Sequence, residues 1–353
     1  MDSSKANFPV ISKPAFVGDF GTDFLAQKVK PGRSALKYLY EKALREVEPK
    51  DLKLGYETYR SKPDVDERLD GMLRYLIEIS EPGAELRKIV HDADFVTWRG
   101  TLTRIGSTPF DTIETGNGWK IACIKLDDVI FLCEYQTDLK KKKEGNADDF
   151  QRLQTYGGFK LEQYLTTERK NGIPNTSAPV STCENYSAVF KLDIGTKYTS
   201  NHVGIFMGAE IDGIDASGRF IEIKSQFRGI GHGRFWSAKE MKWWLQSFLV
   251  GVERLIVGIK ENQSVVKKVM EVNNSDLVRH RTGTWNPTTC VNFLHSYLQT
   301  VRIELNKLPE GTILLTEQFP QEKWTQRVVS HEEKPLYNFL LPEFVRHFNL
   351  SQL

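Results

Sequence analysis

Four polar residues in two short apolar segments have the types and spacing needed for phosphate chemistry. Glu210 and Asp212 end one segment, and Glu222 and Lys224 lie in the next, after a glycine-containing turn over 213–218. In a strand, residues two positions apart point to the same side, about 6.5–7 Å from each other. An antiparallel hairpin that sets Asp212 opposite Glu222 would gather three carboxylates and one ammonium in one patch. A register shifted by one residue would scatter them over both faces.

Such a patch is unfavourable unless its charge is compensated. Two carboxylates about 5 Å apart repel by about 3 kcal/mol at an effective dielectric constant near 20. A divalent cation reverses the sign of this interaction, and carboxylate oxygens without Cys or His are the ligands typical of Mg²⁺ or Mn²⁺. A lysine beside the metal can hold a water or neutralise charge that develops on phosphorus. The spacing therefore indicates metal-dependent phosphodiester chemistry.

The same two pairs also have an ordinary structural interpretation. Glu-x-Asp near a turn and Glu-x-Lys on a strand are both common on the solvated side of an edge strand. Here the neighbouring residues are mostly apolar, namely those over 203–207 and Ile221 and Ile223. A purely solvated face is therefore the weaker interpretation.

The elements that position these residues follow a mixed helix and strand pattern. Helical spacing predicts helices over 33–47, 66–79, 148–167, 238–250 and 286–306, the third of them interrupted or restarted near Gly157 and Gly158. Short apolar runs predict strands over 95–105, 119–126, 129–135, 186–194, 203–212, 219–227 and 254–260, with a last pair within 312–329. We therefore expect an α+β fold, in which a mixed β-sheet core is flanked by helices, as one large catalytic domain over 33–353. Residues 1–32 are expected to form an extended N-terminal arm, and the lysine run over 140–143 a solvated loop tip.

Composition excludes several other classes of protein. The chain has 353 residues with 48 Lys+Arg and 46 Asp+Glu, so its net charge of +2 does not suit a protein that neutralises phosphates over its whole surface. A hydrophobic content of 40% and a charged content of 27% fit a folded globular chain. No run approaches the ~20 apolar residues of a membrane span, and residues 1–14 lack the pattern of a signal peptide. The 4 cysteines form no CxxC pair, so we expect neither a zinc site nor a disulfide-linked partner. We expect a cytoplasmic protein, with a nuclear location as the alternative.

Five motifs occur in a fixed order around the acid pairs. They are Trp98-Arg99-Gly100, Gly158 to Glu162, Glu210-Ile211-Asp212, Glu222-Ile223-Lys224 and Trp244-Leu245-Gln246-Ser247-Phe248. In this order they resemble the PD-(D/E)XK nuclease core and, within it, the DXO family of decapping exoribonucleases, which includes the Rai-type proteins. The resemblance implies a PD-(D/E)XK nuclease-like fold.

The resemblance also implies a role for each matched residue. Metal ligands would be Glu162, Glu210, Asp212, Glu222 and the backbone carbonyl of Ile223, which would hold two Mg²⁺ or Mn²⁺ ions, and the catalytic set would be Glu210, Asp212, Glu222 and Lys224. The substrate-binding residues would be Glu67, Trp98, Arg99, Gly100, Ser187, Glu210, Lys224 and Gln246, of which Lys224 and Gln246 would contact the scissile phosphate and the attacking water. Ser187 stands where the family often has Cys, and nothing over 1–50 matches the N-terminal substrate arginine of the family.

Two further features lie beside these motifs. The predicted helix over 238–250 carries Lys239, Lys242 and Gln246 at intervals of three and four residues, so they lie on one side of it. The loop over 227–236 is rich in glycine and basic residues. We interpret this loop as a flap that contacts phosphate.

The function implied by the resemblance is a metal-dependent hydrolase acting at RNA 5′ ends. It would remove intact or incomplete caps in mRNA 5′-end quality control and trim onward as a 5′-to-3′ exoribonuclease. The alternative is a Rai-type pyrophosphohydrolase that binds and stabilises a nuclear 5′-to-3′ exoribonuclease. A DNA nuclease with the same core is a third interpretation, and the Trp-Arg-Gly and Trp-x-Gln-Ser-Phe motifs weaken it.

Overall fold

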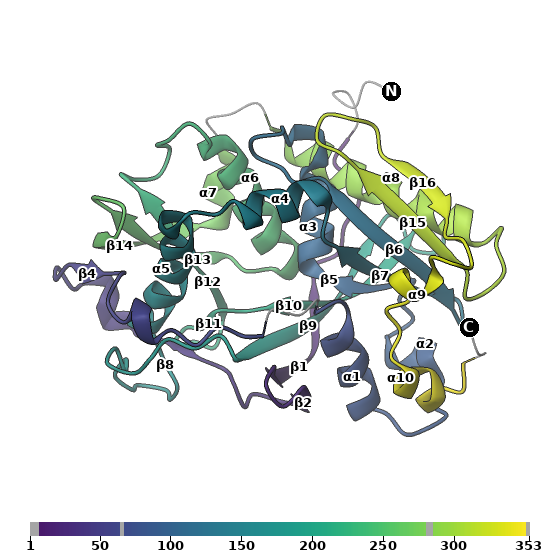
Figure 1. The fold of residues 1–353 in the computed structure, drawn as a ribbon, viewed down its shortest axis with the longest axis horizontal. Helices are drawn as coiled ribbons and strands as arrows, with labels where there is room; N and C mark the ends of the chain where they lie inside the picture. The colour runs from purple at the N-terminus through teal and green to yellow at the C-terminus, as the bar shows by residue number, and fades with distance from the viewer. Residues whose placement is uncertain (1–6, 64–66, 280–284, 351–353) are drawn as a thin grey trace.

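The computed structural model describes residues 7–63, 67–279 and 285–350, which build two mixed β-sheets with helices packed on their faces (Figure 1). From edge to edge, the nine-stranded sheet consists of β16 (Thr325–Val328), β15 (Ile313–Gln318), β6 (Trp119–Leu126), β7 (Val129–Tyr135), β5 (Phe95–Trp98), β10 (Val203–Glu210), β9 (Glu184–Ile194), β1 (Ala15–Asp23) and β2 (Lys28–Pro31). β5 runs parallel to both of its neighbours, β7 and β10, and the other pairs in this sheet are antiparallel.

Both faces of the central strands in the nine-stranded sheet are buried. The core on one face includes side chains of α3 (Arg99–Ser107), α6 (Trp236–Val250) and α8 (Pro287–Leu305), and the core on the other includes those of α1 (Asp70–Glu78), α2 (Leu86–Ile89) and α10 (Pro342–His347). Along β6, Ile121 and Cys123 point into the first core, and Ala122 and Ile124 into the second. This double burial explains why β6 is a continuous apolar run rather than an alternating one.

The seven-stranded sheet is smaller and lies beside α5 (Asp149–Leu165), on the side of the molecule away from β6, β7 and β15 (Figure 1). Its strand order is β4 (Lys50–Asp51), β14 (Val265–Asn273), β13 (Arg254–Lys260), β12 (Phe220–Phe227), β11 (Gly213–Ile214), β3 (Tyr38–Leu39) and β8 (Thr166–Thr167). Leu161 and Leu165 of α5 pack with Ile223 and Ile256 on one face. The other face contributes Leu255 and Val257 to the core that contains α6. The remaining elements are the 3-10 helices η2 (Glu41–Leu44), η3 (Tyr56–Thr58) and η4 (Thr108–Phe110) and the α-helices α4 (Asp138–Gly145), α7 (Asn274–Arg279) and α9 (Lys334–Tyr337).

The predicted fold class, a mixed β-sheet core flanked by helices in one large domain, is confirmed. Strands β6 and β7 have the predicted bounds, and α1, α5, α6 and α8 fall within or close to the predicted ranges. Asp66, the predicted start of the second helix, lies outside the described residues. Within the predicted N-terminal arm, the described residues 7–32 contribute β1 and β2 to the edge of the larger sheet, where β1 pairs with β9. In the described part of the chain, no helix is both long enough and apolar enough to cross a bilayer.

Two predicted elements near the active site are wrong because tertiary contacts override local spacing. Over 33–47 the predicted helix is replaced by β3 and η2, since Tyr38 pairs with Ile214 on one side and Thr167 on the other. The predicted strand over 95–105 stops at Trp98, and α3 begins at once. The β-branched Thr103 suggested a strand, but in α3 its hydroxyl donates to the carbonyl of Arg99 at 3.1 Å.

Three further predictions are corrected. The lysine run over 140–143 belongs to α4, because Thr137 caps that helix by accepting the backbone N–H of Lys140. The helix α5 continues without interruption through Gly157, which lies against Leu52. The predicted strand over 203–212 ends at Glu210 as β10, and the chain then enters the other sheet at β11, which begins at Gly213. The strand β14 was not predicted.

Candidate active site

The predicted acidic residues lie where the two sheets diverge. Glu210 is the last residue of β10 in the larger sheet, and Asp212 lies in the short link to β11 in the smaller sheet. Glu222 and Lys224 lie on β12, and Glu162 lies near the end of α5. Elements from both sheets and one helix therefore supply the charged groups of one site.

The predicted hairpin register is confirmed. β11 and β12 are antiparallel and pair Gly213 with Ile221 and Ile214 with Phe220. One step further, this register sets Asp212 opposite Glu222, and the backbone N–H of Ile223 donates to Asp212 Oδ2 at 2.6 Å. The N–H and C=O of one strand residue point to the same edge, so the carbonyl of Ile223 faces the side on which Asp212 lies.

Glu222 is buried, and its negative charge is compensated by two basic side chains. Lys224 Nζ donates to its Oε1 at 2.6 Å, and Arg99 Nη1 donates to its Oε2 at 3.2 Å. Burial opposes the charge of Glu222, but Lys224 and Arg99 outweigh that effect and lower its pKa to about 2. In turn, Glu222 and Asp212 outweigh the burial of Lys224 and raise the pKa of its ammonium. The Glu222 carboxylate and the Lys224 ammonium are therefore both charged at neutral pH.

The other three carboxyl groups are not compensated to the same extent. Burial, and then the charges of Glu222 and Glu162, raise the pKa of Asp212 well above its usual value. Burial and the charges of Glu210 and Glu222 raise the pKa of Glu162 to about 7, against the opposing charges of Lys37 and Lys224. Glu210 reaches solvent, yet the protein around it also raises the pKa of its carboxyl group. If all four carboxyl groups are ionised, their charge exceeds that of Lys224 and Arg99, the two basic side chains bonded to Glu222.

This excess, together with the donor atoms, fits a divalent cation. The donors are carboxylate oxygens and one backbone carbonyl, which are the ligands that Mg²⁺ and Mn²⁺ prefer. Within the described ranges, no three acidic, His or Cys side chains already lie close enough together to form a metal site. At Glu222, both carboxylate oxygens already accept hydrogen bonds, one from Lys224 and one from Arg99.

Arg99, Trp98 and Gly100 lie at the junction of β5 and α3, beside the acids. Arg99 is the first residue of α3 and not part of a strand as predicted; its Nη2 donates to the carbonyl of Glu210 at 3.4 Å. Its Nε is buried and has no acceptor among the described residues. Trp98 is held by a hydrogen bond from Nε1 to the carbonyl of Arg68 at 2.9 Å, and Gly100 is exposed, with open space where a Cβ would be. This junction therefore leaves a donor and an open backbone position next to the acids.

The remaining predicted substrate residues are less tightly connected to the acids. Ser187 is buried on β9 directly opposite Glu210. Glu67 forms an ion pair with Lys62, and both charges act on the Glu210 carboxyl group, so this pair lies within electrostatic reach of the site. Gln246 is half-buried on α6, and no hydrogen bond connects it to the acids among the described residues.

Two lysines at the site were missed in the sequence. Lys37 acts on Glu162 through its charge, and its backbone carbonyl accepts the N–H of Ile214 at 3.0 Å. Lys62 pairs with Glu67, and its charge opposes the rise in the pKa of Glu210 that burial causes. The helical interpretation of 33–47 concealed Lys37, because the position of this lysine depends on strand pairing at β3.

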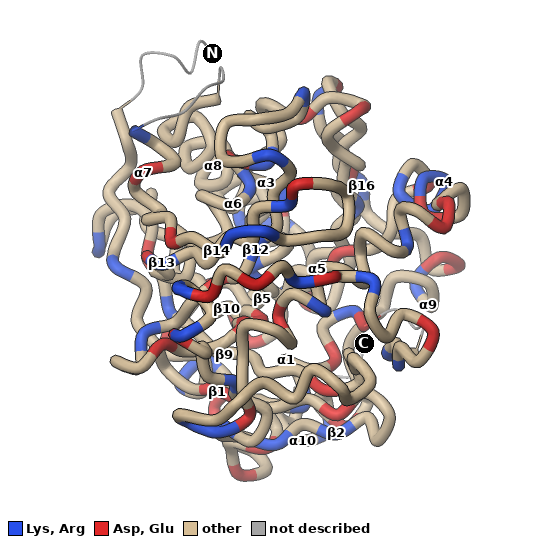
Figure 2. Tube along the Cα trace, turned by 90° about the vertical axis from the view of Figure 1, so that its left-hand side faces the viewer, with Lys and Arg blue, Asp and Glu red and all other residues tan. Residues whose placement is uncertain are grey.

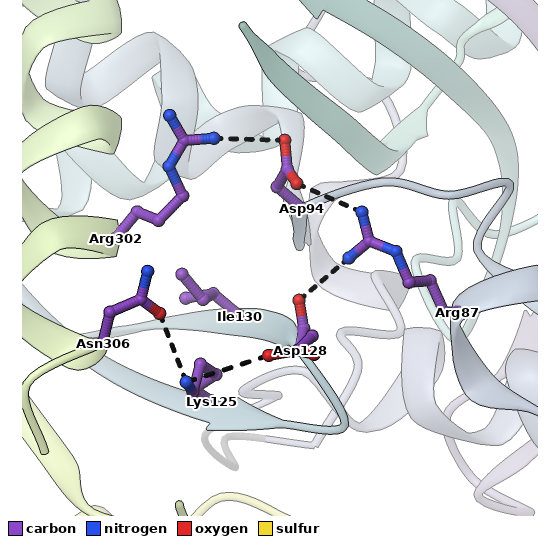
Figure 3. A pocket seen from close by; sticks show the side chains of 7 residues that line it. All are labelled: Arg87, Asp94, Lys125, Asp128, Ile130, Arg302 and Asn306. Carbon is purple, nitrogen blue, oxygen red and sulfur yellow. Dashed lines mark hydrogen bonds and ion pairs between the residues drawn. The ribbon is translucent and has the colours of Figure 1, made fainter. Parts of the chain in front are cut away.

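A separate cavity of about 290 Å³ lies at the opposite end of the parallel strands, where β5 begins (Figure 3). Its charged side chains are paired with one another. Asp94 accepts from Arg87 at 3.4 Å and lies 3.6 Å from Arg302, while Lys125 lies 3.9 Å from Asp128. No residue of the acid cluster lines this cavity.

Comparison with known proteins supports the same conclusion as the geometry. Residues 12–345 match the family described as RAI1 like PD-(D/E)XK nuclease. The chain is 31% identical to the decapping nuclease dom-3 of Caenorhabditis elegans over 97% of this chain and 86% of that protein. It is 29% identical to the decapping and exoribonuclease protein of Xenopus laevis over 84% of this chain and 77% of that protein. Among solved structures, Candida albicans Rai1 in complex with pU5 and Mn²⁺ superposes with a TM-score of 0.77 at 18% identity, covering 98% of this chain and 97% of that one.

The fold and the carboxylate and lysine cluster define a nuclease of the PD-(D/E)XK class. The chain belongs to the family of RAI1-like PD-(D/E)XK nucleases. The family and the enzyme class predicted from the five motifs are thereby confirmed.

Proposed function

We propose that this chain is a metal-dependent hydrolase that acts at RNA 5′ ends, removes intact or incomplete caps, and continues as a 5′-to-3′ exoribonuclease in mRNA 5′-end quality control. The observation that carries the proposal is the cluster at the divergence of the two sheets. There burial and neighbouring carboxylates oppose the ionisation of Glu162 and Asp212, which lie beside the charged Lys224. The names of the C. elegans and X. laevis relatives, which describe decapping and exoribonuclease proteins, support this choice of substrate.

The residues that would hold the metal are Glu162, Glu210, Asp212, Glu222 and the carbonyl of Ile223. Bound there, a divalent cation would supply Lewis acidity and a water of lowered pKa. Mg²⁺ or Mn²⁺ fits the oxygen donors, and two ions would suit the number of carboxylates. The C. albicans relative was solved with Mn²⁺, which supports a divalent ion here.

The charged side chains of the chain itself supply the rest of the chemistry. Lys224 lies where its ammonium can orient the attacking water and neutralise charge that develops on the phosphate. Arg99 is bonded to Glu222 and to the carbonyl of Glu210, so its positive charge lies beside the acids and can attract the 5′ phosphate of the substrate. The N-terminus of α3 at Gly100 adds backbone N–H groups at an exposed position. Gln246 would contact the scissile phosphate from α6.

Activity on RNAs with defined 5′ ends tests the proposal. Capped, triphosphate and monophosphate RNAs are incubated with the chain in the presence of Mg²⁺ or Mn²⁺, with and without chelator, and the products are identified by mass spectrometry. We expect release of a cap or a mononucleotide, loss of this release with chelator, and loss in the Glu222→Gln variant. Cleavage that survives the chelator, or no cleavage of any of these RNAs, contradicts the proposal.

Location and protein partners remain predictions from the sequence. We propose a cytoplasmic protein, and imaging of the tagged full chain tests this. The alternative of a nuclear protein that binds a 5′-to-3′ exoribonuclease is tested by capture of that enzyme from nuclear extract and by its thermal stability in the captured complex.

A further inference from the structure

Two lysines without an assigned role lie near the C-terminal ends of strands β12 and β13. Lys239 lies on α6 and Lys260 is the last residue of β13. Lys239 Nζ donates to Gln226 Oε1 at 3.2 Å, and Lys260 Nζ donates to Gln154 Oε1 at 2.6 Å. Both partners are neutral amides. Among the described residues, no carboxylate acts on either ammonium.

The positive charge of this lysine pair is therefore uncompensated. Desolvation by the surrounding protein lowers the pKa of both ammonium groups, and the charge of Lys239 further lowers the pKa of Lys260. Lys239 is exposed and Lys260 is partly exposed, so both can be reached from solvent. An anion bound near both would offset their repulsion, as a cation would for the acid cluster.

The lysine pair is connected to the active site through three shared elements. On β12, Gln226 follows Lys224 by two residues on the same side, about 7 Å further along the strand. On α6, Lys239 precedes Gln246 by two helical turns, about 10 Å. On α5, Gln154 precedes Glu162 by about 12 Å. Figure 2 shows the basic and acidic segments next to each other around β12, β10 and α5.

The loop that joins β12 to α6 adds aromatic rings to this basic surface. The guanidinium of Arg228 lies 4.9 Å from the ring centre of Phe227, and that of Arg234 lies 5.1 Å from the ring centre of Phe235. Phe227 is 38% exposed and Phe235 is 42% exposed. Gln226 Nε2 holds this loop by donating to the carbonyl of His232 at 2.6 Å.

Basic groups beside exposed aromatic rings are typical of surfaces that bind single-stranded nucleic acid without reading its sequence. The charges hold the phosphates, and the rings stack with bases. Along the shared elements, Lys239 and the two amide partners are offset from the active-site residues by about 7–12 Å, so the lysine pair does not contact the same phosphate. It is near enough to hold a phosphate a few nucleotides along the same strand.

We propose that Lys239 and Lys260 form a second phosphate site that holds the RNA backbone downstream of the scissile bond, with Phe227 and Phe235 as stacking surfaces for its bases. The inference rests on the proposed function of the active site. It assigns the lysine pair to the binding of longer RNA, and assigns no chemical step to it.

The test compares a short and a longer RNA in the full chain. The probes are a 5′-phosphorylated dinucleotide and a 5′-phosphorylated decanucleotide, and binding is measured by fluorescence anisotropy at several salt concentrations in Ca²⁺. In the double variant Lys239→Gln/Lys260→Gln, we expect the Kd for the decanucleotide to rise about tenfold while that for the dinucleotide stays unchanged. The slope of log K against log salt should fall in magnitude by about 0.7, since the lysine pair holds one phosphate and each phosphate contact on a single strand contributes about 0.7.

Two control variants accompany this measurement. Lys268→Gln removes an exposed lysine of β14 in the same sheet and should leave both affinities unchanged. Lys239→Arg/Lys260→Arg keeps the charges and should retain decanucleotide binding. An unchanged melting temperature of the double variant shows that it is folded.

Each outcome separates the inference from the proposed function. If the double variant binds both RNAs as the wild type does, or loses both equally, the second phosphate site is wrong, even if caps are removed. If the wild type binds neither RNA, the inference is also wrong. If the wild type binds the decanucleotide through these lysines but hydrolyses no RNA, the phosphate site stands and the proposed activity fails.

Discussion

Two aspartates that flank the short strand β11 have opposite electrostatic environments. Asp215 accepts hydrogen bonds from the N–H and the hydroxyl of Ser217 and from the N–H and Nε of Arg219, at 2.7–3.0 Å, and it pairs with Arg254 at 3.3 Å. Although its burial opposes ionisation, these donors lower the pKa of Asp215 to about 2. Asp212 accepts one backbone N–H, from Ile223, and its pKa is raised well above the usual value by burial and by neighbouring acids.

The difference separates a structural carboxylate from one that needs a ligand. Both aspartates lie on the same hairpin and have the same side chain, so the difference in pKa comes from their surroundings. What distinguishes them is whether the chain itself supplies the positive charge. Around Asp215 it does, through two arginines, whereas around Asp212 the nearby lysine is already engaged by Glu222.

The largest expected effect is on catalysis. Asp212→Asn removes a charged ligand of the proposed metal site, so we expect kcat/KM on capped RNA to fall by about 100-fold or more. Asp215→Asn changes a residue of the same size on the same hairpin, and we expect it to keep most of the activity at temperatures where it is folded. Steady-state kinetics of the two variants with saturating Mn²⁺ measure this contrast.

This contrast has a clear contradicting outcome. Equal losses in the two variants, with both folded by circular dichroism, would mean that the hairpin as a whole supports activity and that Asp212 has no separate role.

The second effect is on stability, and its sign reverses between the two residues. Asp215→Asn removes the buried carboxylate that pairs with Arg254, so the free energy of unfolding should fall by about 2–3 kcal/mol. Asp212→Asn removes like-charge repulsion with Glu222 and Glu162, so the metal-free protein should become more stable, by about 1 kcal/mol. Urea unfolding in the presence of chelator measures both changes. A loss of stability in Asp212→Asn would show that its bond to Ile223 outweighs the repulsion.

Much of the fold could be predicted because local patterns and burial agree. The apolar runs of β6 and β7 are buried on both faces and separated by Asp127 and Asp128, both of which have positive φ, so their bounds follow from composition and turn residues alone. Near the active site, the agreement fails. Thr103 and its neighbours look like strand residues but fold into α3, and residues 33–47 look helical but are pulled into β3 by pairing with β11 and β8.

The candidate site, too, could be predicted only in part from the sequence. The spacing of Glu210, Asp212, Glu222 and Lys224 predicted the hairpin register, because strand geometry fixes which residues face each other. The pairing of Arg99 with Glu222, and the position of Lys37 beside Glu162, could not be predicted. These contacts join residues far apart in the chain, and they depend on how the two sheets meet.

The third effect is on the pH dependence of stability. The pKa of Asp215 is about 2 in the folded protein and 3.8 in the unfolded chain. Its contribution to the free energy of unfolding is therefore fully present above pH 3.8 and is lost as the pH falls toward 2. The pKa of Glu162 is about 7 in the folded, metal-free protein and 4.5 in the unfolded chain. Its contribution to the free energy of unfolding is therefore fully present below pH 4.5 and is lost as the pH rises through 7.

Each dependence is isolated by a variant. The difference in unfolding free energy between wild type and Asp215→Asn should shrink by about 1–2 kcal/mol on acidification from the neutral range. Glu162→Gln should become more stable than the metal-free wild type as the pH rises, by a similar about 1–2 kcal/mol. Unfolding curves across the pH range, with chelator, measure both. A Glu162→Gln curve parallel to that of the wild type would contradict the raised pKa.

The smallest effect is expected where charges are paired but exposed. Lys125 lies 3.9 Å from Asp128, whose side chain is 82% exposed, at the rim of the cavity in Figure 3. Solvent and salt screen such a pair, so Lys125→Gln should lower the free energy of unfolding by about 0.5 kcal/mol or less and leave activity unchanged. The exposed pair of Asp128 should therefore add little to the free energy of unfolding. Asp215 stabilises the fold because its paired charge is also buried. Unfolding of wild type and Lys125→Gln at low and high salt measures this, and a loss as large as that of Asp215→Asn would show that burial is not the deciding factor.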